Sequence, residues 1–344
     1  MKKSLFFLAL SLVVTGTTYG ALWRVNNTPG VNANFTSVSA ALTAASAGDT
    51  IYLEPSTTPY PAVTITKKVT IIGNGHFYNH VPNGGLNTQN AGLQANAISS
   101  EISSVQFYPG SEFSTIMGCM VFTGGIHVYA SNITIKRNHV WGPIYINNYH
   151  PSLGTYQALT GLDIRQNVLE NTIQPNQFST SGGGAFTNVS IQNNILFGST
   201  ISLPVGVQGY IQNNFISNGN FSVYNFQINN NILVTGSFTP NNNVYFNNIG
   251  SGTQFGNANN NQQNITTTAL FTNYSNTTEN RYILNPTGPG IGAGFNGVDV
   301  GPFGGPDPYK LSGIPPVPTI YQLTAPSTTT TTSLPVTIST RSND

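Results

Sequence analysis

Charged side chains are scarce in this chain. Of its 344 residues only 6% are Asp, Glu, Lys or Arg, whereas an average soluble domain has about 25%. The formal net charge is +1, so there is no basic region that would bind nucleic acid or an anionic membrane. Asn, Thr, Ser and Gly take the place of charge, and we expect a surface that is solvated through amides and hydroxyls.

Cysteine is almost absent too. Cys119 stands alone, which excludes an intrachain disulfide, and it does not follow an apolar leader as a lipid-anchored cysteine would. A secreted chain of this size without disulfides indicates a bacterial exported protein stabilised by its core. The sequence also lacks zinc-ligand spacing, a phosphate-binding loop and a nucleophile elbow, so we predict neither a metal nor a cofactor.

The first 20 residues have the pattern of a secretory signal peptide. Lys2 and Lys3 precede an apolar run from Leu5 to Val14, and small residues lead to a cleavage site near Gly20/Ala21. About ten apolar residues are too few to span a bilayer, which needs roughly 20. We therefore expect a mature chain without a transmembrane span, outside the cell or on the outer surface of a bacterium.

The rest of the chain divides by pattern into three parts. Residues 21–50 form an N-terminal cap that contains one helix, in which Val38, Ala41 and Leu42 recur at helical spacing. Residues 51–308 have strand patterns, interrupted by an aperiodic loop at 76–98. Residues 309–344 are a Pro- and Thr-rich tail.

An internal repeat dominates the central part. Six segments carry an apolar residue, two further residues and then an asparagine: ITIKRNHV, LDIRQNVL, VSIQNNIL, GYIQNNFI, FQINNNIL and VYFNNIG. The aligned asparagines are Asn138, Asn167, Asn194, Asn214, Asn231 and Asn248, with spacings of 29, 27, 20, 17 and 17. Repeats of this length with β character predict an all-β fold, a right-handed parallel β-helix or solenoid, with an N-terminal cap helix and an extended C-terminal tail.

The repeated asparagines have two interpretations. The structural one is that they stack at a bend between two sheets, where each amide bonds the next along the axis and tolerates left-handed backbone. The functional one concerns the preceding column, Asn193, Asn213, Asn230 and Asn247, which would form an outward ladder that binds sugar or ice.

Three stretches resemble a known superfamily. AALTAASAGDTIYL (Ala40 to Leu53) and VTITKKVTIIGNG (Val63 to Gly75) are similar to the N-terminal cap and first turns of the pectate-lyase-like right-handed β-helix superfamily. GPGIGAGFNGVDVGPFGG (Gly288 to Gly305) is similar to its closing segment, and the resemblance spans residues 22–308. The Asn-rich composition also resembles that of surface-exported proteins of Bacteroidetes. The superfamily includes lyases, glycosidases, adhesins and structural proteins, so the resemblance implies the fold and not an activity.

Carboxylates are too few for the usual chemistry of such enzymes. A Ca²⁺ site takes six to eight oxygen ligands and a glycosidase needs a carboxylate pair, but residues 133–250 contain only Asp163 and Glu170. The one polar group that the aligned repeats bring together is Lys136, Arg165 and Asp163. It is either a solvated ion pair or a base with a nearby acid for a metal-free lyase.

Aromatic residues offer candidate ligand contacts. Trp141, Tyr145, Tyr149 and Tyr156 lie near an insertion between repeats, where they would stack on sugar rings or cover the side of the solenoid as local cores. We therefore expect a structural, adhesive or glycan-binding protein whose partner is a polysaccharide or a cell-surface component, with an enzyme using Lys136 or Arg165 as base as the alternative. The sequence leaves the oligomeric state open.

Overall fold

The computed structural model describes residues 20–76, 93, 96, 98–275, 279–328 and 332–343. The predicted leader, 1–20, and the predicted loop, 76–98, lie almost wholly outside the described residues, so their structure is not treated below.

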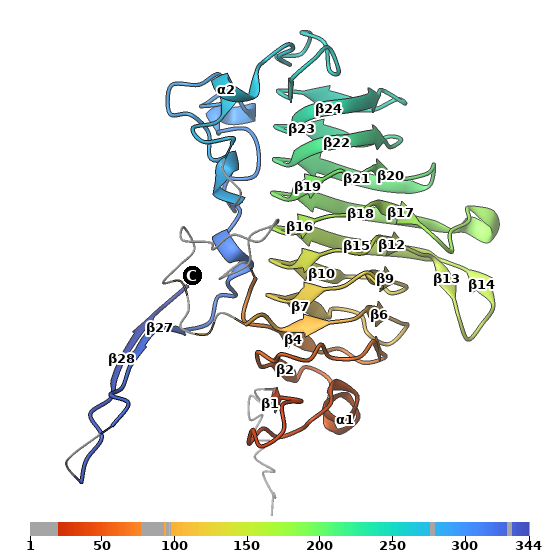
Figure 1. Ribbon diagram of the computed structural model, residues 1–344. Coiled ribbons are helices and arrows are strands. Elements are labelled where there is room, and N and C mark those ends of the chain that lie inside the picture. Colours follow the sequence, from red (N-terminus) through yellow and green to blue (C-terminus); the bar gives the residue numbers. More distant parts are fainter. Residues whose placement is uncertain are drawn as a thin grey trace, which may run out of the picture.

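Most strands of the described chain belong to two long sheets whose neighbouring strands are parallel (Figure 1). The first sheet runs, in spatial order, through β1 (Leu22–Val25), β2 (Thr50–Leu53), β4 (Thr70–Ile72), β7 (Thr115–Met117), β10 (Ile133–Lys136), β15 (Ala158–Arg165), β18 (Ala185–Gln192), β21 (Val207–Gln212), β23 (Gln227–Asn229) and β25 (Val244–Phe246). Because successive turns of chain add parallel strands to the same sheets, the chain is a parallel β-solenoid, which confirms this part of the prediction.

The second sheet consists of two runs of parallel strands. One contains β5 (Glu101–Ile102), β8 (Met120–Val121), β11 (His139–Val140), β16 (Val168–Leu169) and β19 (Ile195–Phe197), and the other contains β3 (Val63–Ile65), β6 (Val105–Phe107), β9 (Ile126–Val128), β12 (Ile144–Ile146), β17 (Ile173–Pro175) and β20 (Ile201–Ser202). The two runs join at the longer strand β22 (Phe215–Ser222), which pairs with both β19 and β20. β24 (Ile232–Thr239) pairs with β22, and β26 (Ile249–Gly250) pairs with β24.

An apolar column fills the interior. Successive side chains of a strand point to opposite faces, and the register aligns the inward residues of the first sheet: Ile116, Ile135, Ile164, Ile191, Ile211 and Ile228. All six side chains are fully buried. Burial of apolar area of this kind is the main stabilising contribution to such a fold.

The predicted N-terminal helix has a clear local cause. α1 spans Val38–Ala44, and the Ser37 side chain accepts a hydrogen bond from the amide of Ala40 at 3.2 Å, as an N-cap does. Val38, Ala41 and Leu42 are buried in the same core as the first strands. The helix lies beside β1 and β2 at the red end of the chain (Figure 1).

After the last turn, the chain runs back along the outside of the solenoid. α2 (Thr267–Leu270) and the 3₁₀ turn η2 (Glu279–Tyr282) lead into residues 285–318, which we call the strap and which contain η3 (Phe295–Gly297) and η4 (Leu311–Gly313). A second apolar cluster joins this region to outward side chains of the second sheet: Val168, Ile195, Phe215, Ile232, Leu270, Phe271, Tyr282, Leu284 and Val300. Figure 1 shows the blue strap descending beside the stacked strands.

Two antiparallel hairpins project from this body. β13 (Tyr149–His150) and β14 (Thr155–Tyr156) form one within an insertion, followed by the 3₁₀ turn η1 (Ser181–Gly183) in the next turn of the solenoid. β27 (Thr319–Thr324) and β28 (Thr337–Arg341) form the other beyond the strap. Residues 309–314, at the start of the predicted tail, include the buried side chains of Tyr309 and Ile314.

Candidate functional site

The asparagines of the repeat form a continuous hydrogen-bonded ladder. The backbone amide of each asparagine donates to the side-chain oxygen of the next, at 2.9 Å from Asn138 to Asn167 and 3.0 Å from Asn194 to Asn214. Each side-chain amide nitrogen also donates to a buried isoleucine carbonyl, as Asn194 does to Ile164 at 2.8 Å. The ladder contains Asn138, Asn167, Asn194, Asn214, Asn231 and Asn248, and it continues to Asn261. All seven are buried, so the ladder serves the fold and presents no surface to a ligand.

The preceding column of asparagines is covered as well. Asn193, Asn213, Asn230 and Asn247 have φ between 53° and 60°, the left-handed backbone that asparagine tolerates. The strap covers them: Asn193 Nδ2 donates to the carbonyls of Pro302 at 3.0 Å and Gly304 at 2.7 Å. Their exposed fractions are 9% or less. The interpretation of this column as an exposed sugar- or ice-binding ladder is therefore wrong, because backbone groups of the strap pair with these side chains. Strap carbonyls accept from Asn193, Asn213 and Asn247, and the Phe295 amide donates to Asn230 Oδ1.

The outward side of the first sheet carries two polar rows. The register aligns Thr134, Asp163, Ser190 and Tyr210 in one row. It aligns Lys136, Arg165, Gln192 and Gln212 in the other. The pairing of Lys136 with Arg165 and of Thr134 with Asp163 is the one that the aligned repeats predict. Both rows lie on one face of the sheet, and neighbouring residues of a row stand on adjacent strands about 4.8 Å apart.

A groove lies over these rows. Its volume is about 490 Å³, and we call it the polar groove. It is lined by Phe113, Asn132, Ile133, Thr134, Gly161, Leu162, Asp163, Arg165, Asn188, Ser190, Gln192 and Tyr210. Phe113 is 61% exposed and Tyr210 is 38% exposed. Phe113 precedes β7 and Tyr210 lies on β21, so an exposed aromatic ring stands toward each end of a floor of amides, hydroxyls and one ion pair.

The three predicted polar residues do come together, and a fourth joins them. Arg165 Nε lies 2.9 Å from Asp163 Oδ2, and Arg165 Nη1 lies 2.9 Å from Oδ2 of Asp307. Lys136 Nζ is 3.8 Å from the same Asp307 oxygen, and Gln166 Nε2 donates to Asp307 Oδ1 at 2.7 Å. The repeats do not include Asp307, so it was not singled out from the sequence. The signal that was available is that it is one of two acids in the Gly- and Pro-rich strap.

Burial sets the electrostatics of this cluster. It raises the pKa of Asp163, against the lowering effect of the Arg165 charge. Burial also lowers the pKa of Lys136, and the positive charge of Arg165 lowers it further. The side chains of Ser190 and Gln192 lie against the Asp163 carboxylate and, like the charge of Arg165, lower its pKa, although burial outweighs them. The floor of the groove is therefore a set of neighbouring hydroxyl, amide and carboxylate groups, to which a ligand hydroxyl could add hydrogen bonds.

The four predicted aromatic contacts lie in three different places. Tyr149 and Tyr156 face each other across the β13–β14 hairpin with ring centroids 5.4 Å apart. Trp141 donates from Nε1 to His139 Nδ1 at 3.2 Å. Tyr145 packs against His127 with centroids 4.7 Å apart. None of the four lines the polar groove, so their role in ligand binding stays a prediction.

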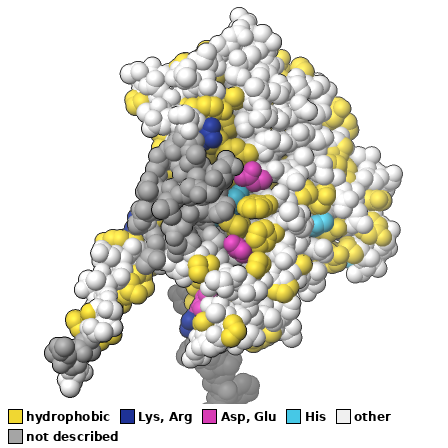
Figure 2. Space-filling view, in the orientation of Figure 1, with side chains coloured by type: hydrophobic (Ala, Val, Ile, Leu, Met, Phe, Trp, Pro, Cys, Tyr) yellow, Lys and Arg dark blue, Asp and Glu magenta, His cyan; other side chains and the backbone are white. Residues whose placement is uncertain are grey.

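Figure 2 shows the face of the molecule seen in Figure 1, where acidic and histidine side chains stand among apolar ones. A separate contact joins His139 Nε2 to Glu170 Oε1 at 3.1 Å, with the His139 side chain buried. Among the residues that the structure describes, no three His, Cys, Asp or Glu side chains lie close enough to hold a metal ion. No helix in the described ranges is both long and apolar enough to cross a bilayer.

Comparison with known proteins adds no relative. No family model, no curated protein and no solved structure matches this chain. Function is therefore argued from the geometry alone.

Proposed function

We propose that this chain is an exported protein that binds glycan chains along the polar groove of its first sheet. The observation that carries the proposal is the groove itself: two exposed rings, Phe113 and Tyr210, over a floor of hydroxyls, amides and the carboxylate of Asp163. Sugar rings stack on aromatic faces through their C–H groups, and their hydroxyls pair with amides and carboxylates.

The wider setting of the proposal comes from the sequence. The leader pattern of residues 1–20 supports export to the outer surface of a bacterium. The parallel solenoid supports the finer interpretation as a right-handed β-helix of the pectate-lyase-like type, with α1 as its N-terminal cap and the β27–β28 hairpin as the extended part of its tail. A rigid solenoid presents its rows at fixed spacing, which suits adhesion to a regular polymer.

The test is binding of the mature chain to a panel of neutral and acidic polysaccharides, by affinity electrophoresis. Tyr210→Ala is expected to weaken binding roughly 5- to 10-fold, the loss of about 1 to 1.4 kcal/mol of ring contact. Tyr156→Ala and Tyr321→Ala are matched controls, since these tyrosines are 38% and 37% exposed but lie on the two hairpins. Binding that survives Tyr210→Ala and is lost with Tyr156→Ala would move the site to the β13–β14 hairpin.

A second candidate is a metal-free polysaccharide lyase. The lowered pKa of Lys136 favours it, because a lysine that loses its proton more readily serves as a base. In this mechanism Lys136 or Arg165 would remove a proton from a sugar carbon, the glycosidic C–O bond at the neighbouring carbon would break, and the two carbons would be left joined by a double bond. The departing sugar oxygen would take up a proton, and Asp163 would orient Arg165. Release of unsaturated products from the same panel, lost in Lys136→Ala or Arg165→Ala, would establish this activity. Intact polysaccharide after prolonged incubation would leave binding alone.

A further inference from the structure

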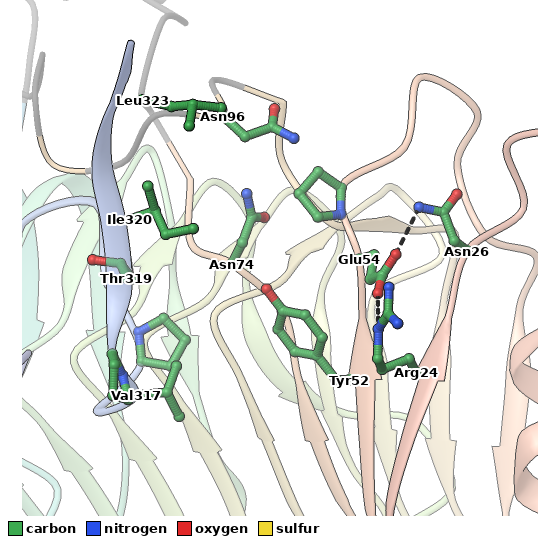
Figure 3. Close-up of a pocket in the computed structure, with 14 residues that line it drawn as sticks. Arg24, Asn26, Tyr52, Glu54, Asn74, Asn96, Val317, Thr319, Ile320 and Leu323 are labelled. Atoms are coloured by element: carbon green, nitrogen blue, oxygen red, sulfur yellow. Dashed lines mark hydrogen bonds and ion pairs between the residues drawn. The ribbon is translucent and has the colours of Figure 1, made fainter. Parts of the chain in front are cut away.

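A second cavity lies at the C-terminal end of the strap, where the chain turns away from the solenoid into β27 (Figure 3). Its volume is about 770 Å³, within the range of roughly 300 to 1,000 Å³ that small-molecule sites occupy. We call it the end pocket. Its lining comes from the first turns of the solenoid and from residues 315–323: Arg24, Asn26, Tyr52, Glu54, Pro55, Gly73, Asn74, Asn96, Pro315, Val317, Pro318, Thr319, Ile320 and Leu323.

The path of the strap explains why the pocket is open here. Further along the solenoid, the strap lies directly against the turns. Gly118 shows how close it lies, because a Cβ added at that position would stand 2.5 Å from Cγ of Pro315. Beyond Pro318 the chain turns away into β27. The first turns, which carry Asn26, Glu54 and Asn74 on this side, are therefore left facing a space instead of the strap.

One wall of the end pocket is polar and electrically balanced. Arg24 Nε pairs with Oε1 of Glu54, and Asn26 Nδ2 donates to its other oxygen at 3.0 Å. Arg24 and Glu54 are the charged residues of the lining, and their charges cancel. Within the described chain, neither the Nη groups of Arg24 nor the hydroxyl of Tyr52 makes a hydrogen bond. Figure 3 shows that hydroxyl directed toward Asn74.

The opposite wall is apolar. Pro315, Val317 and Pro318 form its strap side, and Ile320 and Leu323 extend it along β27. Leu323 is 58% exposed. Side chains that are this open to water are stabilised by a ligand that brings apolar surface to them.

A ligand for this pocket must meet three conditions. It needs hydroxyls for the free donors of Arg24 and for the Tyr52 hydroxyl. It needs an apolar face for the proline and leucine wall, and it needs no net charge, because the lining has none. A neutral sugar ring meets all three, since one side is rich in C–H groups and the rim is rich in hydroxyls. We propose that the end pocket binds a terminal segment of a neutral glycan.

The position of the end pocket suits the end of a glycan. The outward row that contains Lys136 and Arg165 continues toward the N-terminus through Met117, Ile72 and Tyr52. Four strand steps separate Tyr52 from Arg165, which is about 19 Å. Asp307 of the strap lies on this row at Lys136 and Arg165, so the polar groove and the end pocket are two separate sites on one side of the solenoid. This inference rests on the proposed function only for the choice of a glycan as the class of ligand; the pocket itself stands on its own lining.

The experiment measures binding of cellotetraose, xylotetraose, mannotetraose and maltotetraose to the mature chain by calorimetry, with trigalacturonate as the acidic comparison. We expect at least one neutral tetraose to bind, and Tyr52→Phe and Leu323→Ala each to weaken it at least 5-fold. Ile338→Ala is the matched control, because Ile338 is 55% exposed and pairs with Leu323 across the hairpin but does not line the pocket. Trigalacturonate is expected to bind less tightly than the neutral sugar.

The outcomes separate the two sites. If the tetraose binds, weakens with the Tyr52 and Leu323 variants and is indifferent to Tyr210→Ala, the end pocket is an independent site. If polysaccharide binding depends on Tyr210 while the Tyr52 and Leu323 variants behave as wild type, the polar groove stands and the end pocket proposal fails. It also fails if no neutral tetraose binds, or if trigalacturonate binds best.

Discussion

Replacing one ladder asparagine by aspartate tests the physical account of the fold most directly. In Asn194→Asp the shape and the accepting Oδ1 oxygen are kept, so the two hydrogen bonds from Asn167, at 2.9 and 3.0 Å, can remain. The donating nitrogen becomes an oxygen. It then faces the carbonyl of Ile164 and Oδ1 of Asn214, which accept from Asn194 at 2.8 and 3.0 Å. Asn194 is fully buried, so water cannot replace the lost donor.

The magnitude follows from those two contacts. Oδ1 of Asn214 keeps the hydrogen bond from the backbone amide of Asn194, so the two buried oxygens that lose a donor are the Ile164 carbonyl and the introduced carboxylate oxygen itself. Each buried polar group left without a partner costs about 1 to 3 kcal/mol, so the variant should lose about 2 to 6 kcal/mol of unfolding free energy at neutral pH. Burial raises the pKa of the introduced carboxyl above that of the unfolded chain. Its protonated form can donate one hydrogen bond, so the loss is smallest at low pH and grows as pH rises through the raised pKa.

Urea unfolding followed by circular dichroism at pH 4.5 and pH 7 measures both quantities. Asn225→Asp is the matched control, because Asn225 is exposed, has φ of 58° and only accepts a hydrogen bond, from Asn242 at 2.7 Å. It should stay within about 0.5 kcal/mol of wild type. The reasoning is refuted if Asn194→Asp unfolds with the control at pH 7, or if its deficit does not change with pH.

Three further predictions follow from the charged cluster and the lone thiol. Because the pKa of Asp163 is raised by burial, its charged form opposes folding; the melting temperature of Asp163→Asn relative to wild type should therefore increase between pH 3 and pH 7, and a constant difference would contradict the assigned cause. Asp307→Ala removes the strap's contacts with Arg165, Lys136 and Gln166, so limited proteolysis should cut the strap faster while the solenoid fragment persists. Burial raises the pKa of Cys119 to about 12, so at pH 8 on the order of one thiol in ten thousand is ionised, and iodoacetamide should label the chain only after denaturant is added.

The ladder and the strand register were predictable because both repeat. Asn167 and Asn194 recur in the same local pattern, and a parallel solenoid gives equal positions equal neighbours. That is why Lys136 could be paired with Arg165 from the alignment of the repeats alone. The inward isoleucines follow from the same alternation.

The strap and what it does could not be predicted in this way. Asp307 meets Arg165 across 142 residues of sequence, and no periodicity connects a Gly- and Pro-rich segment to the turns that it covers. The outer column, from Asn193 to Asn247, has the same sequence signal whether water or the strap lies over it. Tyr210 stands at the repeat position aligned with Asp163, but the repeat does not show that its ring is exposed beside a groove. Phe113 precedes the aligned segments, so both rings of the polar groove were missed, and the end pocket depends on where the strap departs.

The strap also has a consequence for the order in which the chain can be completed. Its residues, 285–318, follow in sequence every turn that they cover and are therefore synthesised after them. The turns that carry Asn193, Asn213 and Asn230 must stack with those side chains in water, and exchange that water for backbone groups of the strap only when the strap arrives. A chain that ends before the strap would leave those side chains without their strap partners and would lack Val300 and Tyr309 of the second apolar cluster. The final segment thus distinguishes a finished molecule from an unfinished one.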